Sequence, residues 1–522
     1  MSTSKLTPLA DYVYLSSSCS FETFMVERDG VIWRLSPSPK AVFQDGHRGP
    51  ALFDWRQAVP GTAHWRWRQG WLPVLEISDE NTKLEFFATG NELWLRHNEG
   101  HHVQVFTADG DSCDANINAF EAGLTSIQQE WYAFFAGTPE PEPLPGEERA
   151  AWRSTIVQGF LAGCGNHPKY GVGSYHDRVH DGFPPQTIAM VDMLLELGKH
   201  EAAGRRLEYY LERFVQADGT IDYYGPAISE YGMILSLGAR CALSPSGAEW
   251  TRRNAAGMTR IIRMLSRLGN FILHPGEQRF PGLLCGIPEA DTHDRPAIYT
   301  HNNAWIWRGL REWSQAAAEK GLTEAAAECA MESERLGKAL RSALDANRLS
   351  DGLPPYKLPS EEALPDFAAN RDITYANYRY YLELLESGFL TREEALTLIQ
   401  AREERNGELE GMTLFNFRAA FPSLTKMAPF CIDNWPIASY GIALANLGER
   451  QRLHQVIHSH YLYDLSPDTF TAYESIDAEI EGDTPRRAFT DWCVPVQLAY
   501  PRMLSRYSRM LQDNTNHQDQ MI

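Results

Sequence analysis

Residues 184–222, PPQTIAMVDMLLELGKHEAAGRRLEYYLERFVQADGTID, decide the fold. They predict two helices, at 184–198 and 200–216, joined by a link of only Gly198 and Lys199. In the second helix, apolar residues recur at spacings of three and four and share one face: Ala203, Leu207, Leu211 and Phe214. Glycine favours a helix C-cap, and so short a link makes the helices antiparallel. The stretch therefore predicts a helical hairpin, opened by two prolines and followed by a longer loop.

The same pattern recurs through residues 147–511, where twelve helical segments and no convincing strand are predicted. The other ten segments lie at 147–164, 228–243, 248–268, 302–320, 323–345, 374–387, 391–405, 433–447, 449–463 and 493–511. Short links, each with a glycine, alternate with long loops at 165–183, 217–227, 269–301, 346–373, 406–432 and 464–492. This alternation predicts that the long loops gather at one end of the assembly.

Five such hairpins, with a sixth made by the last helix and the first, close into an (α/α)6 barrel. The long loops then meet the N-terminal ends of the inner helices, where unpaired N–H groups attract ligands. The alternative is an open stack of helical repeats, which has a near-constant period and short loops on both sides. The long loops of this chain vary in length, which favours the barrel.

Upstream of the barrel, residues 1–114 alternate short β-rich runs with turn signals, which predicts an N-terminal β-sandwich domain. We expect its dense tryptophans to be mainly core or interface residues: Trp33, Trp55, Trp65, Trp67, Trp71 and Trp94. Residues 115–146 predict a connecting helix, Asn116 to Gly137, and a Pro/Glu-rich linker. Residues 512–522 predict a disordered tail.

Composition narrows the class of ligand. The chain has 522 residues, 43% hydrophobic and 22% charged, with a net charge of −20. It has no basic stripe to neutralise phosphates, which argues against nucleic acid and anionic membranes and for a neutral ligand. It shows neither a signal peptide nor a membrane span, so a cytoplasmic location is expected. Its eight cysteines lack metal-ligand spacing, so no metal or cofactor is predicted; the oligomeric state is not predicted.

The long loops carry the chemistry-bearing residues. The first loop has Tyr175, Asp177, Arg178, His180 and Asp181, the second Tyr224 and Glu230, the third Glu289, Asp291, His301, Asn302 and Trp305, the fourth Arg371 and Asp372, the fifth Asp433, Asn434 and Trp435, and the sixth Tyr473, Glu474 and Trp492. Asp181 has a simpler reading as the N-cap of the next helix. Carboxylates, aromatic rings and a few Arg, Asn and His groups together suit a neutral polyhydroxylated ligand.

Three of these segments resemble a known family. HDRVHDGFPPQ is similar to the W-x-R-D segment of glucoamylases and amylo-α-1,6-glucosidases, although DRVHD replaces that motif. PFCIDNWPIASYGIALANLGE resembles a helix of the same enzymes, and AYESIDAEIEGDTPRRAFTDW resembles a segment of trehalases and processing α-glucosidases. The order of the three along residues 150–511 resembles that of the six-hairpin glycosidases.

The resemblance implies an inverting glycoside hydrolase acting on an α-linked oligosaccharide or small glycoside. By the same resemblance, Glu474 is the general base and Glu289 the general acid, with Asp291 as a rival. Arg178 and Asp181 would grip sugar hydroxyls. Inverting hydrolysis needs two carboxyl groups because one protonates the leaving oxygen while the other activates water.

Two other classes of function remain open. The same barrel can hold a sugar epimerase or a polysaccharide lyase, for which His176, His180 or His301 would serve as the base. A protein that binds carbohydrate without catalysis is the second alternative.

Overall fold

The computed structural model describes residues 12–28, 30–35, 48–59, 62–97, 102–107, 110–142, 146–168, 182–223, 228–270, 280–288, 296–359, 363–364, 366–423, 428–478, 488–489 and 492–519. The chain forms two compact units, and each is described separately. Unit 1 contains residues 1–186 and 457–522, and unit 2 contains residues 187–456. The predicted N-terminal domain thus forms one unit with the first and last parts of the helical region.

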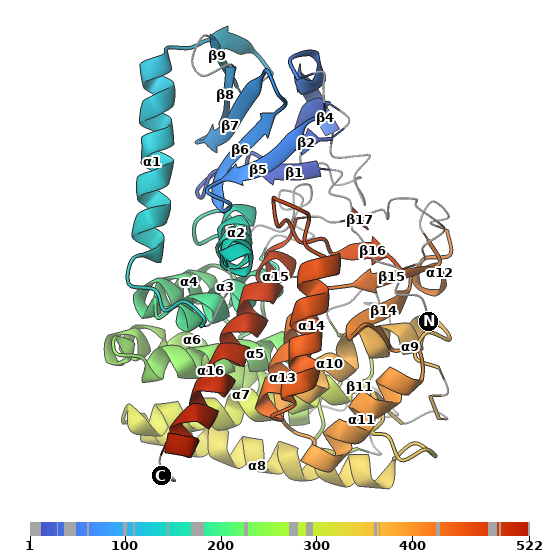
Figure 1. Ribbon diagram of the computed structural model, residues 1–522. Coiled ribbons are helices and arrows are strands. Elements are labelled where there is room, and N and C mark those ends of the chain that lie inside the picture. The colour runs from blue at the N-terminus through green and yellow to red at the C-terminus, as the bar shows by residue number, and fades with distance from the viewer. Residues whose placement is uncertain are drawn as a thin grey trace. The chain divides into compact units, whose positions relative to one another are not determined.

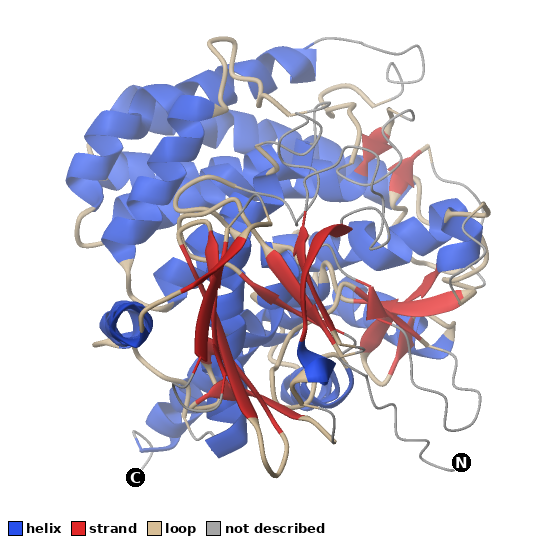
Figure 2. Ribbon diagram, turned by 90° about the horizontal axis from the view of Figure 1, so that it is seen from above, coloured by secondary structure: helices blue, strands red, loops and turns tan. Residues whose placement is uncertain are grey.

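Two antiparallel sheets make up the N-terminal domain (Figure 2). The first sheet holds β1 (Tyr12–Leu15), β2 (Phe24–Glu27), β3 (Val31–Leu35) and β4 (Arg48–Asp54). The second has the order β10-β9-β8-β7-β6-β5 and consists of β5 (His64–Arg68), β6 (Leu72–Ser78), β7 (Lys83–Thr89), β8 (Glu92–His97), β9 (His102–Phe106) and β10 (Ser112–Asp114). Side chains of both sheets share one hydrophobic core, as in a β-sandwich.

The tryptophans of this domain are mostly core residues, as predicted. Along β5, exposed His64 and Arg66 alternate with buried Trp65 and Trp67, which is the period of a strand with one covered face. Both indoles belong to the core between the sheets. Trp55 and Trp71 are also buried, whereas Trp33 and Trp94 are partly exposed.

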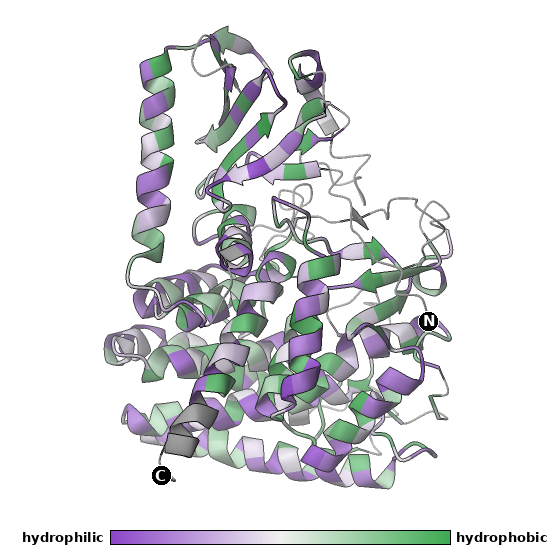
Figure 3. Cartoon of the chain, in the orientation of Figure 1, coloured by the Kyte–Doolittle hydropathy of each residue, from purple (hydrophilic) through white to green (hydrophobic). Residues whose placement is uncertain are grey.

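The connecting helix is confirmed as α1 (Ile117–Phe135), capped by the Asn116 side chain. Its buried residues follow the helical period: Phe120, Leu124, Ile127, Trp131 and Phe135. Hydrophobic and hydrophilic residues alternate along the helix (Figure 3). The Phe120 ring packs on Phe87 of the second sheet at a centroid distance of 4.8 Å, so α1 covers part of the outer face of that sheet (Figure 1).

The remaining helices, except the short α12 within a predicted long loop, agree with the predicted repeat within a few residues at most ends. They are α2 (Gly146–Ala162), α3 (Pro184–Glu196), α4 (His200–Arg213), α5 (Ile228–Leu243), α6 (Gly247–Asn270), α7 (Thr300–Glu319), α8 (Thr323–Ala346), α9 (Arg371–Tyr375), the π-helix η5 (Ala376–Tyr380), α10 (Tyr381–Ser387), α11 (Arg392–Glu404), α12 (Phe417–Ala420), α13 (Ile437–Asn446), α14 (Arg450–Tyr463), α15 (Val494–Gln497) and α16 (Ala499–Asp519). The helix predicted at 374–387 is thus continuous through α9, η5 and α10. The last helix reaches Asp519 and enters the segment expected to be disordered.

Short strands appear where none was predicted. They are β11 (Ile298–Tyr299), β12 (Lys357–Leu358), β13 (Glu408–Leu409), β14 (Met412–Asn416), β15 (Phe430–Asp433), β16 (Ser475–Asp477) and β17 (Ala488–Phe489). Five of these strands have only two or three residues, too few for a readable alternation of apolar and polar residues, which needs at least four. The four residues of β15 are mostly buried and do not alternate either. Asp433 therefore ends β15, whereas it was predicted to begin a helix.

Glycines at the short links have two different roles. Gly198, Gly321, Gly388 and Gly448 have positive φ angles, as helix C-caps require. Gly247 instead begins α6, and a Cβ there would lie 1.8 Å from the Ala242 carbonyl oxygen. Its role is to allow a close approach of the chain to the end of α5.

Glycines also set the packing of α5 against α7 in unit 2. A Cβ on Gly232 would lie 2.2 Å from the Trp305 carbonyl oxygen, and one on Gly309 would lie 2.3 Å from the Gly232 carbonyl oxygen. The backbones of the two helices therefore touch. This contact fixes the beginnings of both helices, which carry Glu230 and His301, relative to each other.

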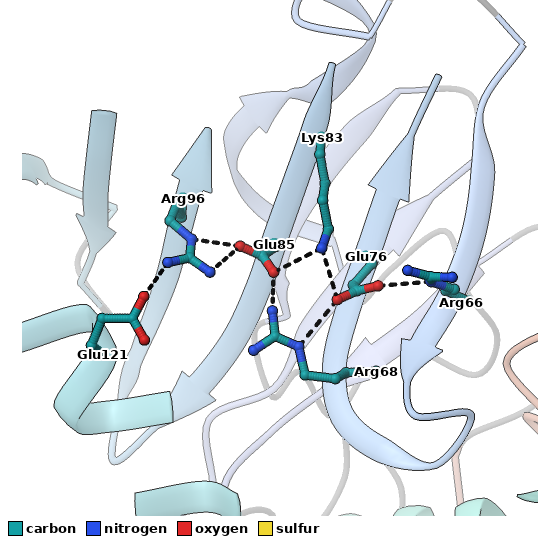
Figure 4. A network of polar contacts seen from close by, with 7 residues as sticks. All are labelled: Arg66, Arg68, Glu76, Lys83, Glu85, Arg96 and Glu121. Atoms are coloured by element: carbon teal, nitrogen blue, oxygen red, sulfur yellow. Dashed lines mark hydrogen bonds and ion pairs between the residues drawn. The ribbon is translucent and has the colours of Figure 1, made fainter. Parts of the chain in front are cut away.

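A buried charge network stabilises the second sheet (Figure 4). Glu76 of β6 and Glu85 of β7 are directly opposite each other, an arrangement that repels when both are charged. Lys83 bridges the two carboxylates at 3.1 and 3.2 Å, and Arg68 contacts both. Arg66 adds a contact to Glu76, and Arg96 links Glu85 to Glu121 of α1.

The same contacts determine the pKa of Glu76. Burial raises it, but hydrogen bonds from Arg66, Lys83 and Arg68 outweigh burial and lower the pKa below its usual 4.5. The contribution of Glu76 to stability is therefore complete above pH 4.5 and is lost as the pH falls through its lowered folded-state pKa.

Glu85→Gln is expected to lower the free energy of unfolding by about 3 kcal/mol, because three cations lose a buried carboxylate. The control is Glu121→Gln at the exposed end of the network, where a loss below about 0.5 kcal/mol is expected. Urea denaturation at pH 7 measures both. Equal losses in the two variants would contradict a buried, cooperative network.

Candidate active site

Several predicted site residues lie outside the described part of the chain. They are Tyr175, Asp177, Arg178, His180, Asp181, Tyr224, Glu289 and Asp291. Of the described candidates, Tyr473, Glu474 and Trp492 belong to unit 1 and the others belong to unit 2.

Glu474 is the partly exposed member of a buried segment. The side chains before it, Ala472 and Tyr473, are fully buried, and Ser475 and Ile476 after it are at most 6% exposed. It directly precedes strand β16. Glu474 is therefore the partly exposed residue of an otherwise closed stretch, and a general base must be within reach of the water it activates.

Tyr473 and Trp492 hold this segment. Both side chains are fully buried. The Tyr473 hydroxyl donates to the Tyr12 carbonyl oxygen at 3.0 Å, and the Trp492 indole stacks on Tyr14 with ring centroids 5.1 Å apart. Strand β1 therefore packs against aromatic rings on both sides of Glu474 in the sequence.

In unit 2, a buried arginine joins two carboxylates. Arg379 of η5 donates from Nη2 to Glu230 Oε1 and from Nε to Glu383 Oε1, each at 2.6 Å. Ser229 donates to the other Glu230 oxygen at 3.0 Å. All three charged side chains are at most 4% exposed. The cluster thus connects the beginning of α5 with η5 and α10 through charge-assisted hydrogen bonds.

His301, at the beginning of α7, completes this cluster. Its ring stacks on Tyr380 with centroids 4.7 Å apart, and its Nε2 lies 3.9 Å from Glu383 Oε2. Burial, with the positive charge of Arg379, lowers the pKa of His301 well below 6.5, so the imidazole is neutral. At 3.9 Å, a neutral His301 forms no ion pair with Glu383, and the compensating positive charge is that of Arg379.

Glu383 has a strongly perturbed pKa. Burial raises it to about 7; Arg379 opposes the shift and the neighbouring Glu230 adds to it. A carboxyl group that titrates near neutral pH inside a polar cluster is a common property of functional sites.

Sequence reasoning missed Arg379 and Glu383 because they lie within a predicted helix and not in a loop. A signal was present, however. In the run YANYRYYLELLES, residues 375–387, the two charged residues stand four apart among aromatic and apolar residues. Such charges on an otherwise apolar helix face indicate a buried pair. The π-helix that carries Arg379 is also a feature frequent at functional sites.

Asn302 and Trp305 lie near His301 in the sequence of α7, and both side chains are nearly fully buried. The Asn302 amide donates to the Ile287 carbonyl oxygen at 3.4 Å, and the Arg308 guanidinium lies 4.9 Å above the Trp305 ring. Within the described residues, some buried polar atoms here have no hydrogen-bond partner: both ring nitrogens of His301, Asn302 Oδ1, Trp305 Nε1 and Glu383 Oε2. Native proteins normally satisfy such groups.

The other candidates of unit 2 lie in the first turn of α9 or in the segment just before α13. Arg371 opens α9 with its guanidinium 5.9 Å from the Tyr375 ring centre, and Asp372 lies 3.5 Å from Lys357 Nζ. Asp433 accepts a hydrogen bond from the Trp435 backbone at 3.0 Å. Asn434 and Trp435 are buried in the turn before α13.

A pocket of about 240 Å³ in unit 2 lies at other helix ends. His200, Glu201, Arg205, Glu249 and Arg253 contribute to its lining, at the beginnings of α4 and α6. None of the predicted site residues lines this pocket.

Among the described helices, none combines the length and apolar composition needed to cross a membrane.

The raised pKa of Glu383 makes the stability of unit 2 depend on pH. Its contribution is complete below the usual value of 4.5 and is lost as the pH rises through about 7. The variant Glu383→Gln cannot ionise at this position and serves as the reference. The unfolding free energy of the wild type minus that of Glu383→Gln is therefore expected to fall by roughly 3 kcal/mol between pH 4.5 and 7. Denaturant unfolding from pH 5 to 8 measures most of this change.

The exposed Glu393, changed to Gln, is the control for that experiment. It should differ from the wild type by the same small amount at every pH. A wild-type-minus-Glu383→Gln difference that does not vary with pH would contradict the titration of Glu383.

Comparison with known proteins places the fold. No protein-family model matches the sequence, and no curated protein matches it either. The structure is similar to that of a bacterial glucoamylase complexed with acarbose, with a TM-score of 0.59 and 10% identity over 97% of this chain and 95% of the other. A rhamnosidase from Klebsiella oxytoca also matches, with a TM-score of 0.46 and 12% identity over 96% of this chain and 89% of the other.

A metal-independent α-mannosidase from Streptococcus pneumoniae matches with a TM-score of 0.46 and 10% identity over 74% of this chain and 98% of the other. The similarity to the glucoamylase and the order of the helical hairpins together define the fold. The chain has the fold of this glucoamylase, an (α/α)6 barrel preceded by an N-terminal β domain.

Proposed function

We propose that the protein is a glycoside hydrolase that cleaves an α-linked oligosaccharide or small glycoside with inversion at the anomeric carbon. The observation that carries the proposal is the placement of Glu474. It is a partly exposed carboxylate within a buried segment of the last long loop, in a chain with a glucoamylase-like fold. The fold likeness alone does not specify chemistry, and the site residues must do so.

In the proposed reaction, Glu474 is ionised and takes a proton from water as the water attacks the anomeric carbon. A second carboxyl group, of Glu289 or Asp291, gives its proton to the leaving glycosidic oxygen. The bond from the anomeric carbon to the new hydroxyl forms as the bond to the leaving oxygen breaks. After product release, bulk solvent restores both protonation states.

The polar cluster of unit 2 suits the binding of a neutral sugar. The buried donors and acceptors of His301, Asn302, Trp305 and Glu383 match hydroxyl groups, which both donate and accept. Arg379 already has two carboxylate partners, so an acidic sugar would have to compete with Glu230 and Glu383. We also propose that Arg178, Asp181 and the other polar loop residues named from the sequence bind sugar hydroxyls.

Glu474→Gln is expected to reduce kcat by 10²- to 10⁴-fold, the usual contribution of a general base, and to leave the fold intact. Asp468→Asn is the matched control, because Asp468 is an exposed carboxylate of the same loop. It should keep wild-type turnover. The assay is release of reducing sugar from α-linked oligosaccharides and aryl α-glycosides, with circular dichroism to check folding; full activity of Glu474→Gln would remove this assignment.

Proton NMR of the first product is expected to show the β-anomer released from an α-linked substrate, followed by slow mutarotation. Initial release of the α-anomer would contradict inversion. An unsaturated product would indicate a polysaccharide lyase, and deuterium incorporation at C2 without hydrolysis would indicate an epimerase. In either of those reactions the neutral His301 would be the first candidate for the base.

A further inference from the structure

We propose that the N-terminal β domain is a positioning element of the active site, which holds the Glu474 segment through Trp67 and strand β1. This inference rests on the proposed function, because it concerns the placement of the proposed general base. All of the residues that carry it belong to unit 1.

The main anchor is the carbonyl oxygen of Thr469, five residues before Glu474. It accepts hydrogen bonds from the Trp67 indole of the sandwich core, from Ser154 Oγ at 3.1 Å and from Gln158 Nε2 at 3.0 Å. A carbonyl oxygen has two lone pairs, so three donors saturate it. The Trp67 side chain is 1% exposed and belongs to the sandwich core, which makes it a rigid donor.

Gln158 of α2 extends the anchor toward Glu474. Its amide also donates to the Phe470 carbonyl oxygen at 3.1 Å, and its Oε1 accepts from the Thr471 hydroxyl at 2.8 Å. On the next residue, the Gln497 side chain donates to the Ala472 carbonyl oxygen at 2.6 Å and accepts from the Ala472 N–H at 3.2 Å. Four consecutive residues, 469–472, are therefore bound by side chains from outside the loop.

Strand β1 provides the last contact before Glu474. The Tyr473 hydroxyl bonds to the Tyr12 carbonyl oxygen, and the two rings meet edge to face with centroids 5.6 Å apart. The β domain thus reaches the residue next to the proposed base. The loop itself is tightly turned, since Asp468 and Phe470 both have positive φ angles. Such backbone conformations persist only where surrounding contacts hold them.

These contacts predict a kinetic role that is separate from stability. Misplacement of a catalytic group by about 1 Å can cost about 10²-fold in rate. Removing the Trp67 donor should therefore reduce kcat about 10- to 100-fold with KM unchanged, because the sugar-binding residues are not altered. Tyr473→Phe, which removes one hydroxyl, should act in the same direction with a smaller effect.

The experiment compares Trp67→Phe with Trp65→Phe. Both tryptophans lie on β5, are buried in the same core and lose the same atoms, so both variants should lower the midpoint of thermal unfolding similarly. Hydrogen exchange of residues 466–476, followed by mass spectrometry, should increase in Trp67→Phe and Tyr473→Phe but not in Trp65→Phe. The kcat should fall in Trp67→Phe and Tyr473→Phe and stay unchanged in Trp65→Phe.

Each result decides the inference. Unchanged exchange in Trp67→Phe overturns the anchor, and raised exchange with unchanged kcat overturns its role in positioning the base. If Trp65→Phe loses as much kcat as Trp67→Phe, the loss comes from general destabilisation of the domain, and the positioning role is overturned. A wild-type protein without hydrolase activity refutes the proposed function instead, and the exchange comparison then tests the anchor alone.

Discussion

The contact between the backbones of α5 and α7 is the constraint on which the polar cluster of unit 2 depends. It exists because Gly232 and Gly309 have no side chains. Helices whose side chains interlock usually lie 8–10 Å apart, and glycine contacts allow a closer approach. The first turns of both helices are then confined to a small space, and this space is filled by Glu230, His301 and the arginine that neutralises the carboxylates.

The two groups of candidate residues are held by different kinds of force. Arg379 organises its cluster through buried charges, whose strength depends on the ionisation of Glu383. The Glu474 segment is held by hydrogen bonds from indole, hydroxyl and amide groups, which do not titrate near neutral pH. These hydrogen bonds to residues 469–472 therefore do not change with pH near neutrality, whereas those of the Glu383 cluster do.

The sequence predicts the elements that depend on local signals. Apolar periodicity located the long helices, and glycine at the links located Gly198, Gly321, Gly388 and Gly448. It also singled out Glu230, His301 and Glu474. What it missed depends on contacts between distant segments. Arg379 and Glu383 look like ordinary helical residues until α5 and α7 pack beside them, and short strands such as β15 form only when a partner strand is present.

The role of Trp67 could not be read from its neighbours either, since its alternation along β5 explains it fully as a core residue. Its acceptor lies 402 residues further along the chain. The contacts of Tyr473 and Trp492 with strand β1 could not be read from the sequence either, because they also join distant segments of the chain.

The 402 residues between Trp67 and Thr469 also mean that the two partners of this hydrogen bond are synthesised at different times. Ribosomes add about 5–20 residues per second, so on the order of 20–80 s pass between the synthesis of Trp67 and that of Thr469. During this interval the sandwich can form its core, but the Trp67 indole N–H has only water or a temporary acceptor in place of the Thr469 carbonyl oxygen. Residues 469–473 then return to the first domain made, so the segment that precedes Glu474 takes its folded position only after almost the whole chain has been synthesised.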